Sequence, residues 1–160
     1  MALKRDLVMQ AVSARMATIL VSNGFRSDIG SHVIEWRPQV LTDGGGGYVP
    51  TEQEELPAIH VRDTNDQVSV ADLSGNEDHE LTLELEIAHE AGATGQTMRK
   101  QAQDVRKVIG VDRTWGGLAR ADYKDQAMTM STVRLKAEQS FFRTLIRTQI
   151  IFTTSAFGEE

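Results

Sequence analysis

The sequence predicts an α+β fold, with two main helices packed on one face of a mostly antiparallel or mixed sheet of about five strands. Two segments have apolar residues at spacings of three and four, and several others alternate or look extended. The two helical segments lie at separate points among the strands, a pattern typical of this class. A chain of 160 residues has the usual size of one domain. We therefore expect residues 1–160 to form a single domain.

The first helix is expected over residues 3–22, followed by a short strand at 31–36. The helix has one apolar face, made of Leu7, Val8, Ala11, Val12, Met16, Ile19 and Leu20. The pair Asn23–Gly24 follows and supplies the left-handed residue that commonly ends a helix. Pro38 disfavours continuation of the strand within a sheet, because proline has no backbone N–H to donate.

Residues 38–55 are predicted to form a long mobile loop. The four glycines at 44–47 leave the backbone free and offer no side chain to pack, and acidic residues follow them. Loops of this length are uncommon in compact domains and often have a function. We expect the segment 42–49 to become ordered only against a partner, so Tyr48 is a candidate interface residue.

The next strand is expected from Leu56 to Val61, with proline tolerated near its start. Residues 63–79 are polar and rich in turn-forming residues, so they predict a connection that contains at most a short strand at 68–70. From 81 to 88, Leu81, Leu83, Leu85 and Ile87 alternate with Thr82, Glu84, Glu86 and Ala88. This alternation predicts a strand with one buried face and one wet, acidic face.

A second amphipathic helix is expected over 94–109, ending at Gly110. Its apolar stripe contains Met98, Ala102, Val105 and Ile109, and its basic side contains Arg99, Lys100, Arg106 and Lys107. Trp115, Gly116 and Gly117 then predict a tight turn, in which the indole either fills the core or contacts a partner; the core position is favoured. Residues 118–124 and 127–137 look extended, and a long final strand is expected over 142–152.

The charges divide into two blocks within a chain of net charge −6. Residues 51–90 contain 12 acidic residues and one basic residue, whereas residues 99–147 contain 11 basic and 5 acidic residues. Solvated faces would explain the blocks, but unlike surfaces also suit head-to-tail self-association. The candidate interface residues are Arg143, Arg147, Glu84, Glu86, Ile150 and Phe152. The acidic balance disfavours a protein that coats nucleic acid.

Residues for catalysis or for cofactor binding do not form a constellation in the sequence. The chain has no Cys, and its histidines (His32, His60, His79 and His89) lack metal-ligand spacing and are interpreted as unrelated surface residues. The glycine run lacks the Lys and Ser or Thr of a phosphate-binding loop, and no serine lies in a nucleophile elbow. The sequence therefore predicts a protein that is not an enzyme and has no cofactor or metal. It also predicts no membrane span and no secretory signal, and hence a soluble, cytoplasmic chain.

Read in order, the segments resemble the tail terminator proteins (minor tail or tail completion proteins) of long-tailed bacteriophages. The resemblance is strongest at residues 112–119, Asp-Arg-Thr-Trp-Gly-Gly-Leu-Ala, directly after an amphipathic helix. It is supported by Leu56-Pro57-Ala58-Ile59 at the start of a strand, by the alternating strand that ends at His89, and by the C-terminal run from Ile150 to Thr154. The N-terminal helix also matches, although the glycine-rich insertion is less typical of the family.

The resemblance implies a structural virion protein at the junction of tail and head, assembled in the host cytoplasm. Family members form hexameric rings that cap the tail tube, stop its growth and present a surface to the neck of the head. The implied partners are further copies of the chain, the tail tube protein and the head–neck connector, with DNA only in transit through the ring. The alternatives are a head–tail connector or another component of the tail tube. A nucleic-acid-binding module, based on the basic residues of the late strands, is a weaker alternative.

Overall fold

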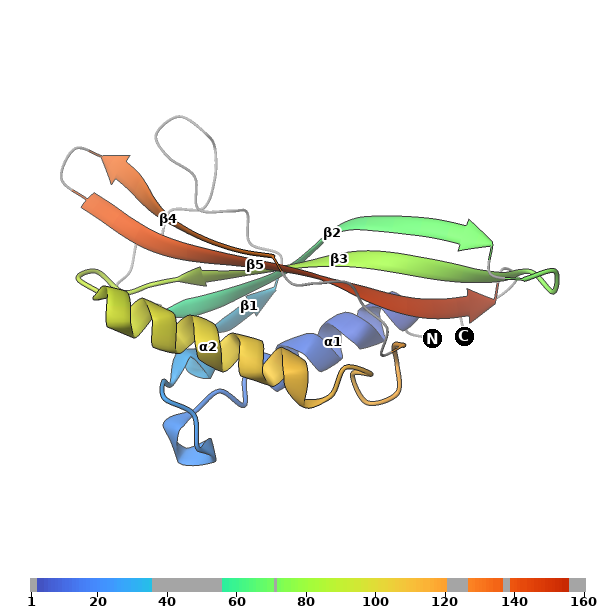
Figure 1. Cartoon of the computed structure of the whole chain (residues 1–160), viewed down its shortest axis with the longest axis horizontal. Coiled ribbons are helices and arrows are strands. Elements are labelled where there is room, and N and C mark those ends of the chain that lie inside the picture. The colour runs from blue at the N-terminus through green and yellow to red at the C-terminus, as the bar shows by residue number, and fades with distance from the viewer. Residues whose placement is uncertain (1–2, 36–55, 71, 121–126, 137–138, 156–160) are drawn as a thin grey trace.

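The computed structural model of the chain describes residues 3–35, 56–70, 72–120, 127–136 and 139–155. Within these residues the chain forms two α-helices and one five-stranded sheet (Figure 1). The helices are α1 (Lys4–Met16) and α2 (Gly95–Val111). The strands are β1 (Val33–Glu35), β2 (Ala58–Val70), β3 (Asn76–Ala88), β4 (Ala127–Lys136) and β5 (Gln139–Ser155). An α+β fold with a mixed sheet and two main helices is thus confirmed.

The strands lie in the order β1-β2-β3-β5-β4. β1 is parallel to β2, and the other neighbouring pairs are antiparallel. Because β3 lies between β2 and β5, its residues face partners on both sides: Glu84 is opposite Arg62 of β2 and Arg147 of β5. This register brings residues from distant parts of the sequence into rows across the sheet.

The hydrophobic core lies between the helices and one face of the sheet. Leu81, Leu83, Leu85 and Ile87 of β3 are completely buried, as their alternation predicts. They form one cluster with apolar residues of both helices and of the neighbouring strands, namely Val8, Val12, Met16, Ile59, Val61, Ala102, Val105, Ile109, Ile146, Ile150 and Phe152. Both helices therefore cover the same face, as Figure 1 also shows.

The first helix is shorter than the sequence predicts. α1 ends at Met16, and Val21–Asn23 form a separate 3₁₀ turn that Gly24 closes with a φ of 82°. A second 3₁₀ turn, Ile29–Ser31, packs against the end of α1, and Gly30 N–H donates to Ile19 O at 2.9 Å. A Cβ at Gly30 would lie 2.6 Å from Met16 O, so only glycine fits this close against the end of α1.

The segment predicted as a connection is instead a long hairpin. β2 continues to Val70 and β3 begins at Asn76, so most of residues 63–79 are paired strands. Asp and Asn, which recur in this segment, have low strand propensity, but pairing with β3 overrides that preference. The turn is held by Asp72, whose carboxylate accepts from Ser74 N–H at 2.8 Å and from Asn76 Nδ2 at 2.7 Å. Hydrogen bonds from the Ser74 hydroxyl, and then from the Asn76 side chain, lower the Asp72 pKa to about 2.

The remaining elements follow the predicted order with shifted ends. Thr94 caps α2 by accepting a hydrogen bond from Thr97 N–H, and Gly110 lies inside the helix rather than beyond it. Arg120 forms an isolated bridge with Ile151 of β5. The predicted loop at 38–55, including Tyr48 and the segment 42–49, lies outside the described residues. Neither described helix is long and apolar enough to cross a membrane.

Candidate functional site

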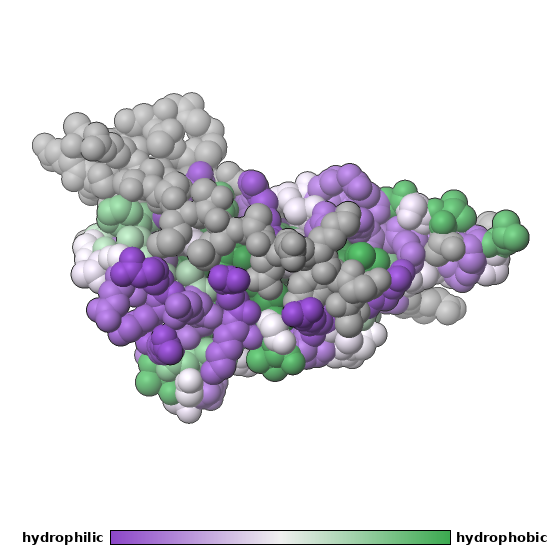
Figure 2. Space-filling view, in the orientation of Figure 1, coloured by the Kyte–Doolittle hydropathy of each residue, from purple (hydrophilic) through white to green (hydrophobic). Residues whose placement is uncertain are grey.

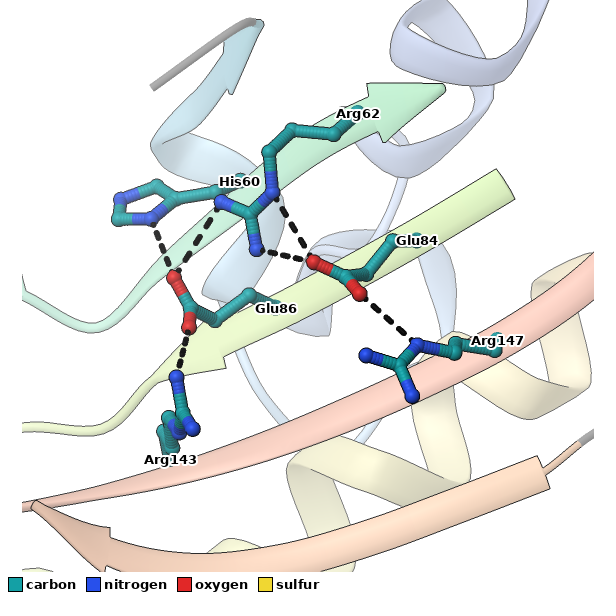
Figure 3. Close-up of polar contacts among 6 residues, drawn as sticks. All are labelled: His60, Arg62, Glu84, Glu86, Arg143 and Arg147. Atoms are coloured by element: carbon teal, nitrogen blue, oxygen red, sulfur yellow. Dashed lines mark hydrogen bonds and ion pairs between the residues drawn. The ribbon is translucent and has the colours of Figure 1, made fainter. Parts of the chain in front are cut away.

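Six charged or titratable side chains meet on the sheet face that points away from the helices (Figure 3). We call this set the ion network; it comprises His60, Arg62, Glu84, Glu86, Arg143 and Arg147. Successive side chains of a strand point to opposite faces, so the residues between the core positions of β2, β3 and β5 share this face. The same alternation that builds the core therefore also builds the network.

Two glutamates of β3 form the centre of the ion network. Glu84 Oε1 accepts from Arg62 Nη2 at 2.8 Å and from Arg62 Nε at 3.1 Å, while its Oε2 accepts from Arg147 Nε at 2.9 Å. Glu86 Oε1 lies 3.1 Å from His60 Nδ1 and 3.4 Å from Arg62 Nη1, and its Oε2 accepts from Arg143 Nη1 at 3.1 Å. Arg62 thus bridges both carboxylates and links β2 to β3.

The network is buried at its centre and open at one margin. The exposed fraction is 1% for Glu84 and 0% for Glu86, whereas the side chain of Arg147 is 54% exposed. Buried charges are tolerated only when they are paired and hydrogen-bonded. The network therefore joins three strands through paired, buried charges. The alternation predicts a wet, acidic face for β3, and this prediction is wrong for Glu84 and Glu86.

Four predicted interface residues pair with each other inside one chain. Arg143 bonds Glu86, and Arg147 bonds Glu84, because β3 and β5 are neighbours in register. The expectation that these opposite charges meet across a subunit boundary is therefore corrected. Replacing both arginines with Glu would place carboxylates beside buried carboxylates, so we expect such a variant to have a lower melting temperature.

The predicted apolar interface residues lie in the core. Ile150 is 2% exposed and Phe152 is 1% exposed, and both belong to the cluster under the helices. Their positions in β5 alternate with those of the network, which sends them to the helix-covered face. They are not available to a second subunit in this fold. Tyr48, the remaining predicted interface residue, lies outside the described residues.

Trp115 fills the core at the end of α2, as the favoured interpretation of its turn predicts. The indole is 1% exposed, and the guanidinium of Arg15 lies 4.4 Å from the ring centroid. Trp115, Gly116 and Gly117 all have positive φ, at 52°, 78° and 85°. The chain therefore turns sharply here, and the two glycines adopt a conformation that costs them little.

Asp112 holds this turn together. Its carboxylate accepts from the Thr114 hydroxyl at 2.6 Å, from Gly116 N–H at 2.8 Å and from Arg15 Nη2 at 3.0 Å. The hydrogen bond from the Thr114 side chain, followed by those from the backbone of Gly116 and Thr114, lowers the pKa of Asp112. Residues 112–117 are therefore a structural element that fixes the indole, joined to α1 through Arg15.

Two histidines interpreted as surface residues are buried. His60 and His89 are both 0% exposed. His89 Nε2 lies 2.8 Å from the Thr144 hydroxyl, and its Nδ1 contacts the Gln101 side-chain oxygen. The sequence offers a signal for this burial, since both residues lie at the ends of apolar segments.

We expect acid to destabilise the fold through His89. Burial lowers the His89 pKa below its ordinary 6.5, although the Gln101 hydrogen bond and the Glu90 charge act in the opposite direction. The unfolded chain then binds this proton more readily than the folded one, so stability is complete above pH 6.5 and falls as the pH drops below it. Urea unfolding at pH 7.5 and 5.5 should show a smaller acid-dependent loss in His89→Gln than in the wild type. Equal losses in the two proteins would contradict this.

His79 lies in a smaller cluster further along β3. Its Nδ1 is 3.1 Å from Asp66 Oδ2, its Nε2 is 3.0 Å from the Thr154 hydroxyl, and its ring stacks on Phe152 with centroids 4.8 Å apart. The contacts join β2, β3 and β5 in one row. The described residues contain no group of three His, Cys, Asp or Glu side chains placed to hold a metal ion.

Comparison with known proteins adds no family: neither a family model nor a curated protein matches the chain.

Proposed function

We propose that this chain is a tail terminator of a long-tailed bacteriophage, a structural protein that forms a ring on the last ring of the tail tube. In that role it stops tube growth and offers a surface to the neck of the head. Its partners are further copies of itself, the tail tube protein and the head–neck connector, and DNA only passes through the ring.

The observation that carries the proposal is the ordered set of segments that resembles this family. Its most specific part, residues 112–119, follows α2 directly and contains the turn that seats Trp115 in the core. The other parts are the starts or ends of paired strands: Ala58 opens β2, and the C-terminal run lies at the end of β5. Segments that resemble the family thus occupy positions on which the fold depends.

The distribution of charge also supports an assembly role over catalysis. The ion network and the Asp112 turn use their polar groups to join elements of the chain. Far from the network, the end of the β2–β3 hairpin has exposed apolar side chains, among them Val70 at 76% exposed. A contiguous group of exposed apolar side chains with polar residues around it is typical of a surface that binds another protein.

The proposal is tested by electron microscopy of tails made in cells that lack the gene for this chain. A terminator's absence should give tails of uncontrolled length, and supplying the wild-type chain should restore one length. Tails of normal length that fail to join heads would overturn the proposal and would assign the chain to the head–tail connectors. A normal yield of complete particles would remove it from tail assembly altogether.

A further inference from the structure

The β2–β3 hairpin extends beyond the helices as an arm. We use this name for residues 66–70 and 72–80, the end of β2, the turn and the start of β3. Figure 1 shows the arm reaching past the N-terminal end of α1, away from α2. In the described residues β1 pairs only with residues 59–61 of β2, so no described strand pairs with the outer edge of the arm. An exposed strand edge is a ready site for another chain.

The arm continues the core-facing side of the sheet without a helix to cover it. Val68 is opposite His79, and His79 is opposite Phe152, a core residue. Val68 and Val70 therefore share the helix side of the sheet, yet they are 53% and 76% exposed. Leu73, in the turn, is fully exposed. Figure 2 shows hydrophobic groups at this end of the molecule.

The arm is also acidic. It contains Asp66, Asp72, Glu77, Asp78 and Glu80, and it contains no Lys or Arg. Three of these carboxylates already have partners within the chain: Asp66 lies beside His79, Asp72 holds the turn, and Asp78 Oδ2 lies 3.1 Å from Arg120 Nη1. A partner that covers the arm must therefore combine positive charge with enough apolar surface to meet Val68, Val70 and Leu73.

The outer side of α2 has that chemistry. Arg99, Lys100, Arg106 and Lys107 are exposed there, and the only acidic residue of the helix, Asp104, is buried. Asp104 accepts hydrogen bonds from Arg26 N–H and the Ser27 hydroxyl, so it does not neutralise this side. The long stems of Lys and Arg can lie on apolar surface while their charges reach carboxylates. Val111, 70% exposed at the end of α2, adds an apolar contact.

The two surfaces belong to different copies when they meet. Figure 1 places α2 under the end of the sheet opposite the arm, so the two surfaces of one chain lie apart. Unlike surfaces at separate places on one molecule produce a heterologous, head-to-tail contact, which closes into a ring when the rotation per subunit allows it.

We propose that the arm of one copy docks on the outer side of α2 of the next copy. The helix of the second copy then continues the helix layer over Val68 and Val70, and its basic residues face Glu77 and the neighbouring carboxylates. The inference deepens the proposed function and rests on it for the closure of the ring, because a ring needs such a contact at every subunit boundary.

Disulfide trapping tests the contact, and the absence of Cys from the chain makes each introduced Cys a single probe. Chains with Leu73→Cys are mixed with larger, tagged chains that have Gln96→Cys, Gln103→Cys or Val111→Cys along α2. Ala14→Cys, on the exposed side of α1, is the matched control. We expect at least one α2 position to cross-link to residue 73 about fivefold more than position 14 does, in line with a contact of modest surface charges. Yields equal to the control, or a dominant link between two copies of residue 73, would overturn the proposal.

Charge exchange then tests whether opposite charges contribute to the contact that the cross-link detects. Glu77→Arg in the arm chain and Arg106→Glu in the helix chain should each lower the yield, whereas the two together should restore it. The yield should also fall between ~0.1 M and ~1 M salt, as the screening length falls from ~10 Å to ~3 Å. No recovery in the combined pair would refute these partners. Binding of short duplex DNA that Arg106→Glu abolishes, with no cross-link, would reassign α2 to nucleic acid.

The outcome separates this inference from the proposed function. One outcome is specific cross-linking of the variants together with tails of normal length in cells that lack the gene. This outcome would retain the head-to-tail contact and reject the terminator role. Uncontrolled tail lengths without any specific cross-link, in free protein or in assembled tails, would retain the terminator role and reject the docking of the arm on α2.

Discussion

Replacing Trp115 with Ala should lower the free energy of unfolding by roughly 3–5 kcal/mol, the usual cost of removing a large buried aromatic side chain. The indole is 1% exposed and lies in the same core cluster as residues of both helices. Arg15 would also lose the ring face over which its guanidinium lies, at 4.4 Å from the centroid. The substitution should therefore destabilise α1 as well as the turn after α2.

Urea unfolding of the isolated protein measures this effect, with Val111→Ala as the control. Val111 lies just before the turn but is 70% exposed, so its truncation should change stability by less than ~0.5 kcal/mol. Trp115→Phe should recover part of the loss, because a smaller ring still occupies the core. A stability unchanged in Trp115→Ala would mean that the indole contributes to contacts between chains rather than to the fold.

The core residues could be predicted because their signal is local. Leu81, Leu83 and Leu85 alternate with polar residues. Because alternate side chains of a strand point to opposite faces, this pattern places all three leucines on the face that packs against the core. The turn at Gly116 and Gly117 is equally local, since glycine readily adopts positive φ. The same holds for α2, whose buried Ala102 and Val105 follow the helical period.

The ends of α1 and β2 could not be predicted in this way. α1 ends where the backbone at Gly30 approaches Met16, a contact between residues that are distant in the sequence. β2 reaches Val70 because β3 provides a partner along its whole length, and nothing in the polar sequence of residues 63–70 indicates that pairing. In both cases a tertiary contact overrides the local preference.

The sequence does not reveal the ion network, because the second face of the sheet is also buried. Alternation distinguishes the two faces of a strand, but it does not reveal whether the polar face meets water or other charges. Glu84 and Glu86 therefore looked like solvated residues that could reach a neighbouring subunit. Arg62, the base that joins them, was the single basic residue in an acidic block of 40 positions, and this was the available clue.

Glu86→Ala should be among the most destabilising single substitutions outside the apolar core. Its carboxylate is 0% exposed and lies within 3.4 Å of nitrogens of His60, Arg62 and Arg143. Removing one member of a buried charge network leaves the others desolvated without compensation, which typically costs ~3–5 kcal/mol. Glu77→Ala, the same substitution on the same strand, is the matched control, because Glu77 is only partly buried and lies outside the network.

Arg147→Ala measures how much a partly exposed charge of the ion network contributes to stability. This side chain is 54% exposed although it bonds the buried Glu84 at 2.9 Å, so water can replace its guanidinium and its loss should cost less than the loss of Glu86. A double-mutant cycle of Arg62→Ala and Glu84→Ala should show strong coupling. Arg62→Ala removes a partner of the buried Glu84 carboxylate, and Glu84→Ala removes that carboxylate itself. If Glu86→Ala cost no more than Glu77→Ala, water would have to reach Arg62 and Arg143 in the folded chain. The second face of the sheet would then be open to solvent, and its arginines would again be candidates for contact with a partner.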